Sequence, residues 1–485
     1  MDREDWGLLL NSQYHKSYKM MTGGTGVKAF EIINTSTTET EYVNVNVRFK
    51  RFSKEDNDTL KLKLRKVSHR EIEEMVKNGR IDLDFCYVDG FEYSKMDCPN
   101  MITRLSARFA LFDGVTDFNG AVFSESSIDF TGAMFRGSVF FENVDFGKEK
   151  TWFSYSQFSE IVTFSNISVA DNIVFDFSCI KSATFYHSYF PKKVSFECSI
   201  IDRISFFKCI FSDNSEASLS FFSCVSDSVF LSNCTIACQQ SYDLRTTKNC
   251  TITNCIVSGN IDFSKINDTN ETGTLALIDN TSTAVIHGDW ESIREAIEQY
   301  RSIPKTSVDI DGNEICADSK EMVLYNTYKA RCDSFTILKE NYHDLGKYDW
   351  EDKAYVALKR NERKMLKERC RLFIQDNTIA IRLKIILSWL IDIIGEYGTN
   401  PTKVAITMFF VYLFFSALFS ISFIPRGGVY WWSGLYFSGI TFLTIGYGEV
   451  MPMGFCGSFL AIVEGFIGMF LMSYFSVAVV RKTLR

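Results

Sequence analysis

Phenylalanine recurs at a nearly constant interval through the middle of this 485-residue chain, and no other feature constrains the fold as much. The recurring residues are Phe130, Phe141, Phe153, Phe164, Phe175, Phe185, Phe196 and Phe206. A second apolar residue usually follows each of them five positions later, and a third often precedes it by two. Helical periods do not fit this spacing, whereas short repeats that cannot bury their own apolar faces stack into solenoids.

The residues within each repeat are strand formers such as Phe, Val, Ile and Thr, separated by Ser, Asn, Asp and Gly, which are typical of turns. We therefore predict a β-helix over residues 81–266, with Phe side chains stacked in its bore. At about 20–22 residues per coil it would hold roughly nine coils, about 40 Å long. The five-residue spacing resembles the pentapeptide-repeat family, and this resemblance implies a right-handed β-helix with an apolar residue pointing inward from each side of a coil.

Several cysteines share one position of the repeat, three residues after an apolar residue: Cys209, Cys224, Cys234 and Cys255. A β-helix would stack them as a ladder, which either binds metal and senses oxidation or simply fills tight corners with small apolar side chains. The sequence favours packing, because no histidine or second cysteine supplies a metal-binding geometry. The 14 cysteines include no C-x-x-C pair, so we expect reduced thiols in a cytosolic setting.

Two apolar stretches near the C-terminus flank the motif T-I-G-Y-G-E at residues 444–449. Residues 404–424 carry no charge, residues 455–480 carry only Glu464, and each stretch is long enough to cross about 30 Å of hydrocarbon. The short run 434–443 between them is predicted to be a helix. Glycines at 446 and 448 let successive carbonyls turn toward one axis, where rings of such carbonyls replace the hydration shell of an ion.

Residues 402–485 resemble the two-helix pore module of the ion-channel superfamily, because residues 436–448 match the pattern Y-F-S-x-x-T-x-x-T-[VI]-G-Y-G. The resemblance implies two spans (404–424 and 455–480), a pore helix (434–443) and a potassium selectivity filter (444–448). The implied ion-binding residues are Thr444, Ile445, Gly446, Tyr447 and Gly448. It also implies a homotetramer, since one chain supplies a quarter of each carbonyl ring. Glu449 stands at the outer mouth, where aspartate is usual, and this leaves the geometry of the mouth open.

Three residues of the second span are candidates for gating: Glu464, Gly465 and Gly468. Glu464 is the only charge in this apolar stretch, and a charge inside a membrane is a functional candidate by default. Because it lies near the filter, we expect it to hydrogen-bond behind the filter or the pore helix. Either glycine could act as a hinge or could pack closely against a neighbouring helix, and the sequence leaves both interpretations open.

Residues 267–378 are predicted to form a helical linker, in which a basic helix spans 350–375. Between residues 353 and 371 it holds eight Lys or Arg against two Glu. These cations either pair with acidic side chains or contact anionic headgroups or a neighbouring subunit. The apolar stretch 379–396 carries Arg382, Lys384 and Asp392, so we expect a helix lying at the inner membrane surface rather than a third span. The turn Y-G-T-N-P at 397–401 resembles the turn that precedes the pore in pentapeptide-repeat potassium channels.

The predicted order is thus an N-terminal cap region (1–80), a β-helix (81–266), a helical linker (267–378), an interfacial helix and turn (379–400) and an all-α pore domain (401–485). Basic residues flank both spans on one side, so the positive-inside rule places both termini in the cytoplasm. We expect a plasma-membrane protein of a prokaryotic cell.

The expected function is a potassium-selective homotetrameric channel whose cytosolic β-helix serves gating or assembly. Expected partners are membrane lipids and an unknown cytosolic ligand or regulatory protein. The net charge of −7 excludes a strongly basic nucleic-acid binder. No enzyme constellation, cofactor site or metal site other than that for the transported K⁺ is predicted. The alternative is a membrane-anchored pentapeptide-repeat scaffold with a non-selective or inactive pore.

Overall fold

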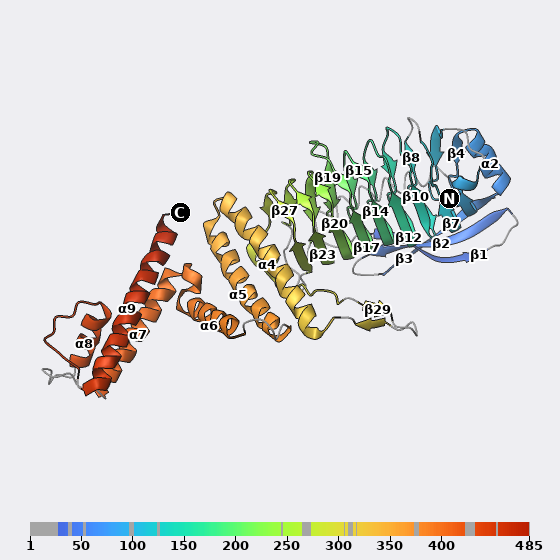
Figure 1. The fold of residues 1–485 in the computed structure, drawn as a ribbon. Helices are drawn as coiled ribbons and strands as arrows, with labels where there is room; N and C mark the ends of the chain where they lie inside the picture. The colour runs from blue at the N-terminus through green and yellow to red at the C-terminus, as the bar shows by residue number, and fades with distance from the viewer. Residues whose placement is uncertain are drawn as a thin grey trace. The chain divides into compact units, whose positions relative to one another are not determined.

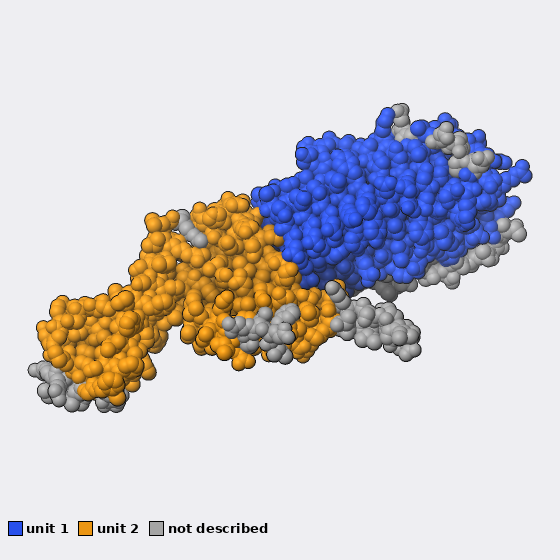
Figure 2. Space-filling model, viewed as in Figure 1, with its two compact units in different colours: residues 1–301 blue, residues 302–485 orange. Residues whose placement is uncertain are grey.

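The computed structural model describes residues 28–36, 41–51, 55–96, 101–123, 127–243, 246–263, 273–304, 306–308, 314–316, 318–372, 378–421, 432–452 and 454–484. The chain divides into two compact units, Met1–Arg301 and Ser302–Arg485, each of which is described by itself (Figures 1 and 2). The first unit is a β-solenoid and the second is helical, apart from a short pair of strands. Parts of the predicted cap region and the segment after the first span lie outside the described residues.

The solenoid is built from three sheets whose strands run parallel from turn to turn. One sheet holds β4 (Arg80–Asp82), β6 (Arg104–Ser106), β8 (Ile128–Asp129), β11 (Thr151–Trp152), β13 (Ile173–Val174), β16 (Val194–Ser195), β19 (Ser218–Phe221), β22 (Gln239–Tyr242), β25 (Ile261–Asp262) and β28 (Ile286–His287). A second holds β5 (Cys86–Glu92), β7 (Leu111–Asp117), β10 (Val139–Glu142), β12 (Gln157–Ser165), β14 (Cys179–Tyr186), β17 (Ile200–Phe207), β20 (Val225–Ser232), β23 (Thr247–Thr253) and β26 (Thr274–Ile278), with β9 (Met134–Phe135) beside β7 and β12. The third holds β15 (Tyr189–Phe190), β18 (Ile210–Phe211), β21 (Thr235–Ile236), β24 (Ile256–Val257) and β27 (Thr281–Ser282).

Ten successive strands of the first sheet enclose nine turns, as the sequence predicts. The predicted coil length, however, is too narrow a range. Ile173 pairs with Val194, which fits that range, but Val194 pairs with Leu219 and Ile261 with Ile286, and both of these turns are longer. The additional residues enter corners, such as the turn closed by the hydrogen bond from Ala217 N to Asn214 O, and leave the strand register intact.

The bore of the solenoid is filled by stacked phenylalanine rings, which confirms the predicted core. One ladder joins Phe130, Phe153, Phe175, Phe196 and Phe221, with ring centroids 4.8–5.2 Å apart. A second joins Phe118, Phe141, Phe164, Phe185 and Phe206 at 4.6–5.1 Å. Rings of the two ladders meet edge to face, and all of these side chains are fully buried. The recurring Phe of the sequence therefore alternates between two faces of the bore, in geometries that aromatic pairs favour.

Both ends of the solenoid are covered. At the first end, helix α2 (His69–Lys77) begins at a capping box between Ser68 and Glu71, and the antiparallel strands β1 (Lys28–Ser36), β2 (Tyr42–Arg51) and β3 (Glu55–Val67) extend the second sheet. At the other end, α3 (Trp290–Gln299) buries Trp290 and Ile293. The solenoid does not end at residue 266 as predicted, because β26, β27 and β28 continue all three sheets to His287.

The predicted cysteine ladder is correct for three of its four members. The Cys234 amide donates a 3.3 Å hydrogen bond to Cys255 Sγ, and Cys209 and Cys234 are hydrogen-bonded neighbours. Cys224 instead aligns with Ser199, because Ile200 pairs with Val225 in adjacent strands. All four are free and buried, and a hydrogen bond with Cys209 together with burial raises the pKa of Cys234 to about 12. A protonated thiol is a weak nucleophile and metal ligand, which favours the packing role for Cys234, whereas its hydrogen bond with Cys209 lowers the pKa of Cys209.

The second unit consists mainly of helices (Figure 1). They are α4 (Lys320–Asp344), α5 (Tyr348–Leu372), α6 (Thr378–Gly395), η2 (Glu396–Gly398), α7 (Pro401–Ile421), α8 (Ser433–Phe442) and α9 (Gly454–Thr483); β29 (Thr306–Val308) pairs with β30 (Glu314–Cys316). Among the described helices, α7 and α9 are long and apolar enough to cross a membrane. The solenoid, the helical linker and these two apolar helices agree with the predicted fold class.

A buried carboxylate joins α5 to α6. Asp392 is 7% exposed and accepts hydrogen bonds from Arg360 at 2.9 and 3.1 Å and from Arg363 at 3.0 Å. Burial acts to raise the pKa of Asp392, but the hydrogen bonds from the two arginines outweigh it and hold that pKa below its usual value. Cations of the basic helix therefore pair with α6, a partner that the sequence analysis did not identify.

Candidate functional site

Helix α8 fits between α7 and α9 because glycine and aromatic side chains allow close approach. A Cβ at Gly434 would lie 2.0 Å from Ser420 Oγ of α7, and a Cβ at Gly468 of α9 would lie 2.3 Å from the Phe442 carbonyl oxygen. The Phe437 ring packs edge to face on Phe419, with centroids 4.8 Å apart. The C-terminal end of α8, from which the filter sequence continues, is thus held by backbone contact with α9.

The predicted filter residues 444–448 follow α8 as a loop with alternating backbone conformation. Thr444, Gly446 and Gly448 have φ values of 57°, 61° and 81°, in the left-handed region. No described atom lies within 4 Å of a Cβ at either glycine, so glycine is required here by conformation rather than by space. Alternation of this kind turns neighbouring carbonyls in a way that a regular strand does not, as a ring of ion ligands requires.

The start of the filter loop is anchored to α8. The amide of Thr444 donates to the Thr441 carbonyl at 3.0 Å, and the amide of Ile445 donates to the Ile440 carbonyl at 2.8 Å. Beyond these bonds, the loop of a single chain is open: Ile445 is 48% and Tyr447 67% exposed. The main-chain oxygens predicted to bind ions therefore lie on a surface that one chain leaves uncovered.

Glu449, predicted at the outer mouth, is tied back to the pore helix. The Tyr436 hydroxyl donates a 3.0 Å hydrogen bond to Glu449 Oε2. The longer glutamate side chain thus still reaches α8. Tyr436 was not among the predicted site residues, although it is the first residue of the recognised pattern.

Glu464 lies fully buried behind the filter, where its carboxylate accepts a hydrogen bond from Ser438 of α8. The Ser438 hydroxyl also lies 3.3 Å from the Tyr412 carbonyl oxygen of α7, and the Tyr412 hydroxyl donates to the Leu435 carbonyl at 3.2 Å. All three helices therefore meet at one polar cluster. This is the contact with the pore helix that the sequence predicts for Glu464, whereas its role in gating stays a prediction.

The two glycines of α9 differ in their surroundings. Gly468 packs against the Phe442 carbonyl, whereas no described atom lies within 4 Å of a Cβ at Gly465. The geometry thus gives Gly468 a packing role, and the hinge interpretation remains a prediction for Gly465.

Comparison with known proteins agrees with this geometry. Residues 406–485 match the family model described as "Ion channel". This part of the chain is therefore similar to ion-channel domains. The match covers α7, α8 and α9 and does not extend to the solenoid or to the linker helices. No curated protein and no solved structure matches the chain.

Proposed function

We propose that four copies of this chain form a potassium-selective channel. The observation that carries the proposal is the loop 444–448, which combines the sequence T-I-G-Y-G with left-handed backbone at alternate residues. Four such loops around one axis would supply rings of carbonyl oxygens spaced to replace the water around a dehydrated cation. A single loop cannot enclose an ion, so the site is incomplete without the other copies.

Exposed apolar side chains support the tetramer. In one chain α9 leaves large apolar residues uncovered along one stripe of the helix: Phe455, Phe459, Ile462, Phe466, Met469, Phe470, Val477 and Val480. A transmembrane helix needs such residues both for lipid and for contact with other subunits. Ile445 is exposed beside backbone polar groups that would be unfavourable in lipid, because lipid offers them no hydrogen-bond partner. We therefore expect a neighbouring subunit to cover this residue.

We place the protein in a plasma membrane with α7 and α9 as its two spans and both termini in the cytoplasm. Helix α6 precedes α7 and exposes Leu383, Leu387 and Trp389 together with the cations Arg382 and Lys384. Apolar and basic side chains on one exposed helix suit the boundary between headgroups and acyl chains. The solenoid would then lie in the cytosol, where it serves gating or assembly.

Flux measurements test the proposal. Purified full-length protein in vesicles should conduct K⁺ and exclude Na⁺, and Gly446→Ala or Tyr447→Ala should abolish selective conduction. Gly465→Ala is a matched control, because it makes the same change outside the filter and should leave the ratio of K⁺ to Na⁺ flux unchanged. Equal K⁺ and Na⁺ flux, or a monomer by native mass spectrometry, would overturn the proposal and leave a membrane-anchored scaffold as the better description.

A further inference from the structure

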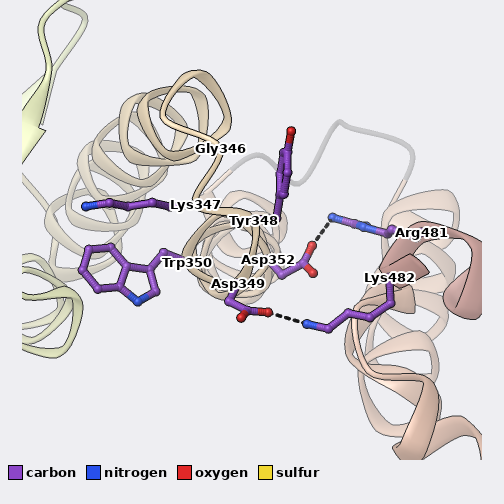
Figure 3. Close-up of a pocket in the computed structure, with 8 residues that line it drawn as sticks. All are labelled: Gly346, Lys347, Tyr348, Asp349, Trp350, Asp352, Arg481 and Lys482. Atoms are coloured by element: carbon purple, nitrogen blue, oxygen red, sulfur yellow. Dashed lines mark hydrogen bonds and ion pairs between the residues drawn. The ribbon is translucent and has the colours of Figure 1, made fainter. Parts of the chain in front are cut away.

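The C-terminal end of α9 meets the N-terminal end of α5 through two ion pairs. Arg481 Nη2 lies 2.8 Å from Asp352 Oδ1, and Lys482 Nζ lies 2.5 Å from Asp349 Oδ1 (Figure 3). Both pairs lie within the second unit, although their members are far apart in the chain. The channel helix that follows the filter is thereby joined directly to the helical linker.

The two helix ends are electrostatically matched. Asp349 and Asp352 lie near the start of α5, where the partial positive charge of the helix favours anions, and Arg481 and Lys482 lie in the last turns of α9, where the opposite charge favours cations. Each charged side chain is therefore stabilised by its own helix as well as by its partner.

The two pairs differ in burial. The side chains of Arg481 and Asp352 are 23% and 8% exposed, whereas those of Lys482 and Asp349 are 46% and 78% exposed. An exposed pair contributes little, whereas removing the cation from a buried carboxylate costs more. The Arg481–Asp352 pair is consequently the stronger of the two contacts.

Aromatic contacts reinforce the same junction. The Arg481 guanidinium lies 4.8 Å from the centroid of the Tyr355 ring, one turn further along α5. Two turns earlier in α9, Tyr474 packs against the η2 turn, where a Cβ at Gly395 would lie 2.9 Å from its ring. The last turns of α9 are thus held at two levels, by α5 and by the turn that leads into α7.

A cavity of about 560 Å³ adjoins the ion pairs and is lined by both of them together with Lys347, Tyr348 and Trp350 (Figure 3). Open space therefore lies beside the contact, and the Arg481 side chain is itself partly exposed although Asp352 is buried.

We propose that the Arg481–Asp352 pair is a latch through which the helical linker acts on the pore. When the latch is closed, the end of α9 is fixed to α5; when it opens, that end is free to move, and the opening of the pore changes with it. This inference rests on the proposed channel function for its conductance readout, but the contact itself does not depend on which ion is conducted.

Single-channel recording from full-length protein in planar bilayers tests the latch. Asp352→Asn and Arg481→Gln should each change the ratio of open to closed times by about tenfold, in the same direction, and the double variant should add less than about twofold to either. The exposed pair is the matched control, since Asp349→Asn and Lys482→Gln should change this ratio by no more than about threefold. Additive effects at Asp352 and Arg481, or effects no larger than those of the control pair, would overturn the latch.

A second measurement does not need conduction. In full-length protein in lipid nanodiscs, hydrogen–deuterium exchange at residues 348–355 should quicken in Arg481→Gln and stay unchanged in Lys482→Gln. Equal exchange in the two variants would refute the latch even in a protein that conducts potassium. Faster exchange in Arg481→Gln would support it even if the pore proved non-selective, so the two proposals fail separately.

Discussion

A methyl group at Gly468 should disturb the filter through the end of α8, the helix that precedes it. In Gly468→Ala the new Cβ would lie 2.3 Å from the carbonyl oxygen and 3.1 Å from the carbonyl carbon of Phe442, the last residue of α8. An ordinary C···O contact needs about 3.3 Å, so α8 and α9 must separate by about 1 Å. Because the obstructing atoms are backbone, no side-chain rotation can relieve the overlap. Overpacking of this kind costs about 1–3 kcal/mol.

Gly465→Ala is the control, since it makes the same chemical change one turn earlier in the same helix. No described atom lies within 4 Å of its Cβ, and alanine in place of glycine favours a helix by up to about 1 kcal/mol. In Gly468→Ala the melting temperature in detergent and the ratio of K⁺ to Na⁺ permeability should therefore both fall. In Gly465→Ala both should be preserved, with less frequent opening if Gly465 is a hinge.

Selectivity should be lost through the position of α8, because this helix directly precedes the predicted filter loop that begins at Thr444. A Gly468→Ala protein with unchanged melting temperature and unchanged selectivity would refute it. A protein that melts earlier but keeps its selectivity would show that the filter does not follow the end of the pore helix.

Three further predictions concern the parts outside the pore. Phe164→Ala removes a fully buried ring from between two others and should lower the free energy of unfolding of the solenoid by about 3–5 kcal/mol in denaturant titrations, whereas the exposed Phe140→Ala should change it by far less. Asp392→Asn leaves two arginines without their carboxylate and should destabilise the α5–α6 junction by about 1–3 kcal/mol, read from thermal unfolding; an unchanged melting temperature would contradict this. Burial, together with the nearby carboxylate of Glu197, raises the pKa of Asp176 to about 6. Protonated Asp176 should therefore stabilise the fold fully below about pH 4, and this stabilisation should be lost as the pH rises through 6. Asp176→Asn should make the free energy of unfolding depend less on pH over this range.

The solenoid was predictable because its signal is local and repeated. Each turn repeats the same pattern, with an inward Phe on alternate faces. A wrong assignment at one turn is therefore not carried into the next. The end of the solenoid was missed because Leu277 of the last turn takes the position that Phe206 holds three turns earlier, with Leu231 and Ile252 between them. The core position is kept there, but the residue that marked it in the sequence is absent.

The assignment of Cys224 failed for a related reason. Several faces of a coil can each place a small residue three positions after an apolar one, so this spacing does not say which face a cysteine occupies. Strand pairing decides it, because Val225 pairs with Ile200 and brings Cys224 beside Ser199. Corners of variable length change the number of residues from one turn to the next without changing the strand register. Residue spacing along the sequence cannot reveal this difference.

The filter loop was recognisable for a different reason, since its chemistry allows few alternatives. Left-handed backbone favours glycine, which helps to make positions 446 and 448 visible in the sequence, although Thr444 and other non-glycine residues of this chain also adopt it. The supporting contacts leave no such trace. Ser438 and Tyr412 are ordinary residues that become important because Glu464 and the carbonyls of α7 and α8 lie beside them in the fold.

The role of the cations in the basic helix α5 depends on the partners that the fold places beside them. The sequence alone favours contact of these cations with an anionic membrane surface and pairing with acidic side chains equally. Arg360 and Arg363 instead enclose Asp392 of the following helix, and Asp352 at the start of α5 binds Arg481 of α9. The same helix therefore carries a buried contact to α6 at its middle and a contact to the end of α9 at its start. In the proposed latch, a displacement of α5 would reach α9 through Asp352 and α6 through Arg360 and Arg363, so one helix would connect the linker to both.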